Sequence, residues 1–145
     1  MRKLLICLLL AAACTSRTTT VPPAPAPASG PRHALDAFLA SVRSQDLQAM
    51  SAVWGDRDGP VRDSKRMTRD EMEKRELLLM CYFGHDRYRV LGDTPGTNGE
   101  RVLQVELIKG TLRRTTNFYL TSGGDRWYVR SADIEPVKDL CQSRR

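Results

Sequence analysis

The spacing of the hydrophobic residues changes near residue 85, and this change limits the chain to one fold class. Before it, the apolar residues of 35–42 recur at intervals of three and four, the period of an amphipathic helix. After it, Leu103, Val105 and Leu107 alternate with polar residues, the period of a strand with one buried face. Helices followed by strands predict an α+β domain, with three N-terminal helices packed on a curved four-stranded antiparallel sheet.

Local signals place the three predicted helices. They span residues 32–43, 47–54 and 69–83. Asp46 can cap the second helix, and Thr68 with Glu71 has the spacing of a capping box at the start of the third. The charged segment 56–65 contains Gly and Pro and is predicted to be a loop. Residues 77–83 are apolar on every side, which predicts that this end of the third helix is deeply buried.

Four strands are predicted on period-two alternation. They centre on residues 87–90, 103–107, 112–120 and 127–130. The links at 109–110 and 122–125 are short enough for hairpins, so the second, third and fourth strands are expected to pair antiparallel. Residues 92–99 are predicted to link the first two strands, and residues 133–141 to form a short closing turn.

The N-terminal residues are predicted to lie outside the domain. Arg2 and Lys3 precede an apolar run over 4–13, which is too short to cross a bilayer and is typical of a secretory signal. The run ends in three alanines followed by Cys14. This ending resembles the lipobox of bacterial lipoproteins, which implies lipidation of the Cys14 thiol and cleavage before it. An ordinary signal peptide with an alanine-rich cleavage site is the alternative.

The lipoprotein resemblance divides the chain into four parts. They are a signal peptide (1–13), a lipidated cysteine with a Pro-rich linker (14–31), an α+β domain (32–141) and a tail (142–145). Five of the eight prolines lie in the linker, a composition typical of a semi-rigid spacer. The resemblance implies a cell-envelope protein held by its lipid anchor. Because residue 15 is not Asp, it also implies the outer membrane, facing the periplasm.

Composition excludes several classes of function. Five of the 23 basic residues lie in the signal, linker and tail, so 18 basic residues balance 17 acidic ones in the domain. Nucleic acid is therefore not an expected partner. The chain has two His without metal-ligand spacing and no nucleotide-binding glycine motif, so neither a metal nor a cofactor is expected.

The order of helices and strands, with Gln45-Asp46 after the first helix, resembles the nuclear transport factor 2-like superfamily. The resemblance implies a sheet bent around the helices and a conical cavity. The superfamily contains enzymes, ligand binders and assembly modules, so it implies no single activity. We expect non-enzymatic binding of a small apolar ligand or a protein partner. The alternatives are an isomerase- or dehydratase-type enzyme that uses the cone, and a small structural lipoprotein that assists outer-membrane assembly.

Three aromatic residues, Trp54, Tyr82 and Tyr119, are the candidates for a ligand pocket. No catalytic residue is predicted. An isomerase of this type needs an acid and a base inside the cone, and no carboxylate is expected to point into the apolar interior. His85 would act as a general acid or base only if it faces a pocket, and a helix-end role is the alternative.

Two further groups of residues leave alternatives open. Cys81 and Cys141 remain in the mature domain, and an oxidising compartment favours a disulfide between them. The alternative is a buried Cys81 and a free Cys141. Arg87, Arg89 and the pair at 113–114 either recognise an anion or form a solvated sheet face with acidic neighbours.

Overall fold

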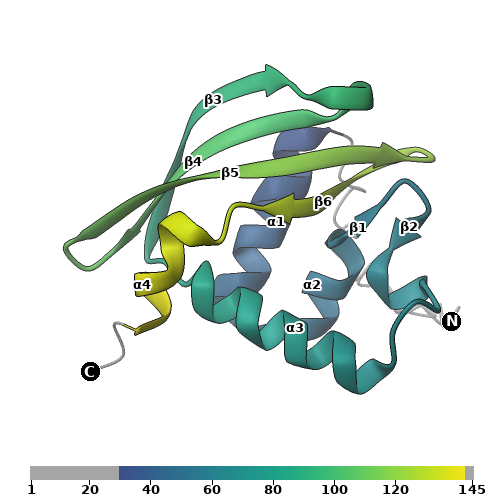
Figure 1. Ribbon diagram of the computed structural model, residues 1–145, viewed down its shortest axis with the longest axis horizontal. Helices are drawn as coiled ribbons and strands as arrows, with labels where there is room; N and C mark the ends of the chain where they lie inside the picture. Colours follow the sequence, from purple (N-terminus) through teal and green to yellow (C-terminus); the bar gives the residue numbers. More distant parts are fainter. Residues whose placement is uncertain (1–29, 143–145) are drawn as a thin grey trace, which may run out of the picture.

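The sheet lies across one side of a layer of helices, and a last short helix returns to that layer (Figure 1). The computed structural model describes residues 30–142. Its first three helices are α1 (Pro31–Ser44), α2 (Leu47–Val53) and α3 (Arg69–Tyr82). These bounds agree with the predicted helices to within two residues at each end, and the prediction of three helices before the sheet is confirmed.

Side chains at the helix starts explain these bounds. Pro31 occupies the first turn of α1, where the missing N–H costs nothing. The Asp46 carboxylate accepts a hydrogen bond from the Ala49 N–H at 2.9 Å, as predicted for the cap of α2. At the start of α3, the Glu71 N–H donates to the Thr68 hydroxyl, and the Thr68 N–H donates to the Glu71 carboxylate. The predicted capping box is therefore confirmed.

The segment predicted as a loop contains regular structure. Strands β1 (Gly55–Asp56) and β2 (Gly59–Pro60) pair antiparallel, and the 3-10 helix η1 (Val61–Asp63) follows. A Cβ at Gly55 would lie 2.4 Å from the Gly59 carbonyl oxygen, so this pairing requires glycine. Strands of two residues are too short for a period to show in the sequence, which is why the prediction was wrong.

The four strands of the main sheet form a meander in chain order. They are β3 (Arg87–Pro95), β4 (Arg101–Lys109), β5 (Leu112–Gly123) and β6 (Arg126–Ala132), and each pairs antiparallel with the next. The predicted hairpins are confirmed. The predicted link at 92–99 was too long, because β3 continues to Pro95 past a bulge between Val90 and Gly92. Its last residues are largely exposed, so no alternation marks them.

Three phenylalanine rings fill the space between α1 and the sheet. Phe38 comes from α1, Phe83 follows α3, and Phe118 lies on β5, and all three are at most 1% exposed. Their ring centroids lie 5.0 to 6.1 Å apart. Leu103 pairs with Phe118 across β4 and β5, which continues the apolar layer into the sheet. These residues form a packed apolar core between α1 and the sheet.

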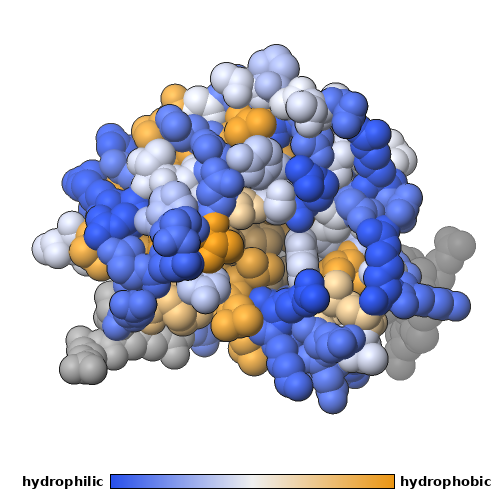
Figure 2. Space-filling view, in the orientation of Figure 1, coloured by the Kyte–Doolittle hydropathy of each residue, from blue (hydrophilic) through white to orange (hydrophobic). Residues whose placement is uncertain are grey.

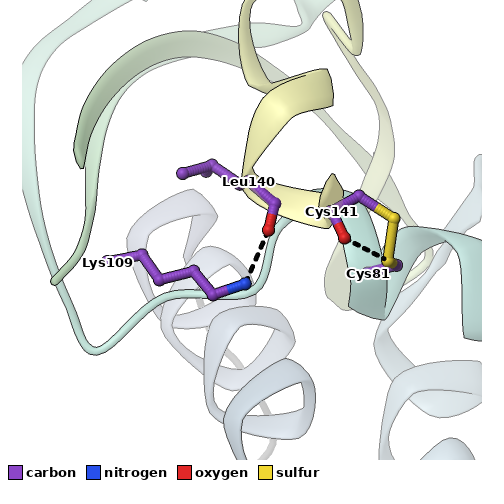
Figure 3. The surroundings of a disulfide bond; sticks show 4 residues. All are labelled: Cys81, Lys109, Leu140 and Cys141. Carbon is purple, nitrogen blue, oxygen red and sulfur yellow. Dashed lines mark hydrogen bonds between the residues drawn. A yellow bond between two sulfur atoms is a disulfide. The ribbon is translucent and has the colours of Figure 1, made fainter. Parts of the chain in front are cut away.

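A helix after the sheet corrects the prediction that all helices are N-terminal. The 3-10 helix η3 (Glu135–Val137) leads into α4 (Lys138–Gln142), which packs against α3 (Figure 1). Val137 and Leu140 are fully buried. The predicted closing turn thus exists and is completed by a helix. The predicted disulfide between Cys81 and Cys141 is present and joins the end of α3 to α4 (Figure 3).

The prediction that the C-terminal half of α3 is deeply buried on every side was wrong. Leu77 is 58% exposed and Leu78 is 53% exposed, whereas Glu76 is only 1% exposed. The core face of α3 carries Glu76 and Met80, and Phe83 follows on the same side. The helix therefore has one buried face and one solvent-facing apolar face.

Candidate functional site

The three aromatic residues predicted to line a pocket do not converge. Trp54 is partly buried against the core and borders a small hollow of about 130 Å³ beside β1. Tyr82 packs against the core at the end of α3. The Tyr119 hydroxyl lies 3.2 Å from a carboxylate oxygen of Asp133, and the Arg130 guanidinium lies over its ring at 5.9 Å. The three side chains thus lie at different places in the domain.

A larger hollow runs along the outer face of α3. It has a volume of about 730 Å³. Its lining includes Gln45, Leu47, Leu77, Leu78, Met80 and Cys81. Lys74 borders it one helical turn before Leu78. We call this hollow the α3 groove.

Hydrophobic residues gather near the middle of the face in Figure 2, over the part of α3 next to α4, with hydrophilic residues on both sides. Lys74, Leu77, Leu78 and Cys81 follow the three- and four-residue spacing of one helix face. In the described chain, Leu77, Leu78 and Leu91 are the exposed large hydrophobic residues, and Leu91 lies apart from the other two on β3. The α3 groove thus concentrates exposed apolar surface at one place, which is the usual mark of a binding site.

The ends of α3 fix which face points outward. The capping box holds the start of the helix, and at the other end the Phe83 ring is enclosed between Phe38 and Phe118. Cys81 is bonded to Cys141 of α4, which covers the last turn (Figure 3). Leu77 and Leu78 lie one turn earlier, where α4 does not bury them.

Glu76 is buried on the core face of α3. Both of its carboxylate oxygens lack a hydrogen-bond partner among the described residues. Burial, with a smaller effect of the Glu73 charge, raises the pKa of Glu76 to about 7. This corrects the expectation that no carboxylate points into the apolar interior. Glu76 does not line the α3 groove, so its proton is not presented to a molecule bound there.

His85 lies just after the end of α3 and lines a hollow of about 200 Å³, as a residue with an acid–base role would have to do. Its Nδ1 lies 2.8 Å from the Phe83 carbonyl oxygen, which can only accept, so Nδ1 carries the proton and donates. Burial lowers the pKa of His85, which favours the neutral ring. Nε2 is buried without a partner in the described chain. Asp86, which lines the same hollow as His85, accepts from the Gly110 N–H at 2.7 Å.

The arginines of the sheet are mostly paired. Arg89 and Arg113 both contact the Glu106 carboxylate, at 2.7 and 3.5 Å. Arg114 pairs with Asp139 of α4. Arg89, Arg113 and Arg114 of the sheet therefore form ion pairs with acidic neighbours. This is the second of the two alternatives left open by the sequence, and not an open anion site. Asp139 in turn has its pKa lowered by the Arg114 hydrogen bond.

Sequence reasoning missed the residues that shape the α3 groove. Leu47, Leu77, Leu78 and Met80 were all assigned to helices, but their apolar faces were assigned to the core. The available signal was the apolar run at 77–83, which covers every side of the helix. A helix that lies on a single core cannot bury all of its sides, so an all-round apolar segment at the edge of a small domain indicates exposed apolar surface as readily as deep burial.

The described residues contain no group of three or more His, Cys, Asp or Glu that could hold a metal ion. Within 30–142 no helix has the length and apolar character needed to cross a membrane. Cys14, the predicted lipidation site, lies outside the described residues. Comparison of the chain with protein-family models, curated proteins and solved structures found no match.

Proposed function

We propose that this protein is a non-enzymatic binding protein of the cell envelope, and that its binding surface is the α3 groove. The observation that carries the proposal is the half-exposed pair Leu77 and Leu78 beside a hollow of about 730 Å³. Burying an exposed leucine removes apolar area from water and favours association with an apolar ligand. The interior between α1 and the sheet is packed with aromatic rings, so the proposed surface is external and not the cone that the superfamily resemblance implied.

The proposed location rests on the N-terminal sequence. The apolar run ending at Cys14 and the Pro-rich linker support acylation of Cys14 and anchoring at the outer membrane, with the domain facing the periplasm. The Cys81–Cys141 bond supports a compartment outside the reducing cytosol. Intact-mass spectrometry of the purified protein tests the anchor. A chain that starts at residue 14 and carries acyl chains is expected, and an unmodified Cys14 with residues 1–13 still attached would overturn it.

One observation favours the enzyme alternative, namely the raised pKa of Glu76. A carboxyl group that titrates near neutral pH suits acid–base chemistry. The carboxyl group is enclosed by the core and lies away from the groove. A proton donor must come within hydrogen-bond reach of its substrate, so this geometry does not favour catalysis. Assistance in outer-membrane assembly would use the same external apolar surface, with a protein segment as the occupant.

A neutral photoreactive probe tests the proposed surface. The full chain is placed in phosphatidylcholine vesicles with the methyl ester of a diazirine-bearing dodecanoate, and the cross-linked residues are mapped by mass spectrometry. Cross-links are expected on α3 and at the start of α2. In the Leu77→Ser/Leu78→Ser variant, this labelling is expected to fall by more than half.

Leu91→Ser is the matched control, because Leu91 is 49% exposed and lies on β3, outside the groove. It removes a leucine of similar exposure and is expected to leave α3 labelling unchanged. Labelling spread evenly over the domain, or equal losses in the control and the groove variant, would contradict the proposed surface.

A further inference from the structure

A second hollow continues the α3 groove toward the sheet. It has a volume of about 200 Å³ and shares Gln45, Met80 and Cys81 with the groove. Its other lining residues include Arg43, His85, Asp86 and Lys109. We call it the basic cleft. Because the two hollows have three residues in common, they form one continuous surface that is apolar over Leu77 and Leu78 and positively charged at the far end.

The positive side chains of this surface form no ion pair within the described chain. Arg43, Lys74 and Lys109 have no carboxylate oxygen within 4.0 Å among residues 30–142, by contrast with the paired arginines of the sheet. Lys109 is held at the cleft by its Nζ, which donates to the Leu140 carbonyl oxygen at 2.6 Å (Figure 3). Asp86 also lines the cleft and keeps its negative charge while accepting from the Gly110 N–H, so Arg43 and Lys109 place two positive charges there against one negative charge.

The shape and the charge together select a class of ligand. We propose that the groove and the basic cleft bind a free single-chain anionic amphiphile, with its hydrocarbon chain over Leu77 and Leu78 and its carboxylate or phosphate head at Arg43 and Lys109. This proposal rests on the proposed function and names its ligand. Charge-assisted hydrogen bonds to an anionic head are among the stronger polar contacts, and a hydrocarbon chain gains by leaving water. From Lys74 to Cys81 the helix rises about 10 Å, which suits a chain of medium length.

Other occupants fit this surface less well. A second copy of the chain docked face to face would bring the same residues together, because an isologous interface meets its own surface. Arg43, Lys74 and Lys109 would then face their own counterparts and repel them. A bilayer surface is contacted best by a protruding apolar patch, whereas Leu77 and Leu78 border a hollow.

Paired photoreactive probes test the ligand class. Diazirine-bearing dodecanoate and its methyl ester share one chain and differ in charge, and both are applied to the full chain in phosphatidylcholine vesicles. The acid is expected to label α3 at roughly tenfold lower concentration than the ester. Arg43→Gln removes one charge from an exposed side chain and is expected to lose most of this preference. Arg43→Gln/Lys109→Gln is expected to abolish it.

Arg87→Gln is the matched control. Arg87 is an exposed arginine on β3 that forms no ion pair among residues 30–142 and does not line the groove or the cleft. It is expected to keep the preference for the acid. Retention of the Cys81–Cys141 bond and of the thermal transition shows that Arg43→Gln/Lys109→Gln is folded, and Arg43→Gln alone carries the test if the double variant is not.

The outcomes separate the two proposals. If the acid and the ester label α3 equally, and Leu77→Ser/Leu78→Ser loses this labelling, the proposal of an anionic ligand is overturned but the proposed binding surface is supported. Absence of α3 labelling by either probe would overturn both. Cross-links between two copies through α3 would assign the surface to self-association and overturn the ligand proposal. If a diazirine-bearing phosphatidylglycerol in the bilayer labels α3 and the free acid does not, the surface binds anionic lipid of the membrane. That result would also overturn the proposal of a free ligand.

Discussion

Glu76 is expected to make the domain less stable at neutral pH than at mildly acidic pH. In the folded protein burial raises the pKa of Glu76 from 4.5 to about 7. The unfolded chain therefore loses the proton near pH 4.5, while the folded chain keeps it until about pH 7. Between these values the folded state binds more protons than the unfolded state, so the free energy of unfolding falls as pH rises. At about 1.4 kcal/mol per pH unit, the total loss is roughly 3 kcal/mol, and it is complete above pH 7.

Glu76→Gln removes this titration and keeps the shape of the side chain. The measurement is urea unfolding of both proteins, with the disulfide intact, at pH 5 and pH 8. We expect the variant to gain about 2.5 kcal/mol relative to the native protein on going from pH 5 to pH 8, because part of the total loss has already occurred at pH 5. The two proteins are compared with each other because the titration of His85 changes the stability of both, in the direction opposite to that of Glu76. Its pKa is lowered in the folded state, so its contribution to stability rises with pH up to its ordinary value of 6.5.

Glu73→Gln is the control on the same helix. The Glu73 charge is the smaller of the two causes that raise the pKa of Glu76, so its removal is expected to shift the pH dependence slightly downward and leave most of its amplitude. An equal stability difference between native protein and Glu76→Gln at pH 5 and pH 8 would refute the reasoning. It would mean that the carboxylate is solvated or paired in the folded protein.

Two further predictions concern what holds the layers together. Replacement of Cys81 and Cys141 by serine opens a loop of 60 residues, and the chain-entropy model predicts that the free energy of unfolding falls by roughly 4 kcal/mol. Urea unfolding of the native protein with and without reductant is expected to show a decrease of similar size. Phe118→Ala removes the ring that contacts both Phe38 and Phe83 in a fully buried position, and is expected to cost about 3–5 kcal/mol in the same assay, whereas a loss below about 1 kcal/mol would mean that the ring cluster does not form.

The parts of the fold that were predicted from the sequence are those set by local chemistry. Thr68 and Glu71 satisfy each other's backbone groups whatever surrounds them, and Asp46 caps α2 in the same way. Alternation along β4 placed Leu103, Val105 and Leu107 on the buried face, because a strand of nine residues with one covered face shows its period clearly. The disulfide was predicted because two cysteines, Cys81 and Cys141, fall within the predicted domain.

The parts that were not predicted depend on which neighbour covers which surface. The β1–β2 hairpin is fixed by close backbone contact: a Cβ at Gly123 would lie 2.8 Å from the Arg57 carbonyl oxygen, a constraint that reading the segments separately does not reveal. The last residues of β3 lie in an edge strand and are largely exposed, so the spacing of hydrophobic residues does not reveal this part of the strand. The α3 groove depends on where the α1–α2 connection passes α3, because Gln45 and Leu47 line it together with residues of α3.

The orientation of α3 is where local preference and tertiary structure conflict most. A rotation of this helix about its axis would bury Leu77 and Leu78 and return Glu76 to water. The observed orientation instead carries a cost of roughly 3 kcal/mol at neutral pH for Glu76, and forgoes about 1 kcal/mol for each half-exposed leucine. The capping box, the Phe83 ring and the bond from Cys81 to α4 hold the helix against that rotation. In natural proteins such conflicts concentrate at sites of function. Leu77 and Leu78, which this orientation leaves exposed, line an apolar groove that adjoins Arg43 and Lys109 in the basic cleft.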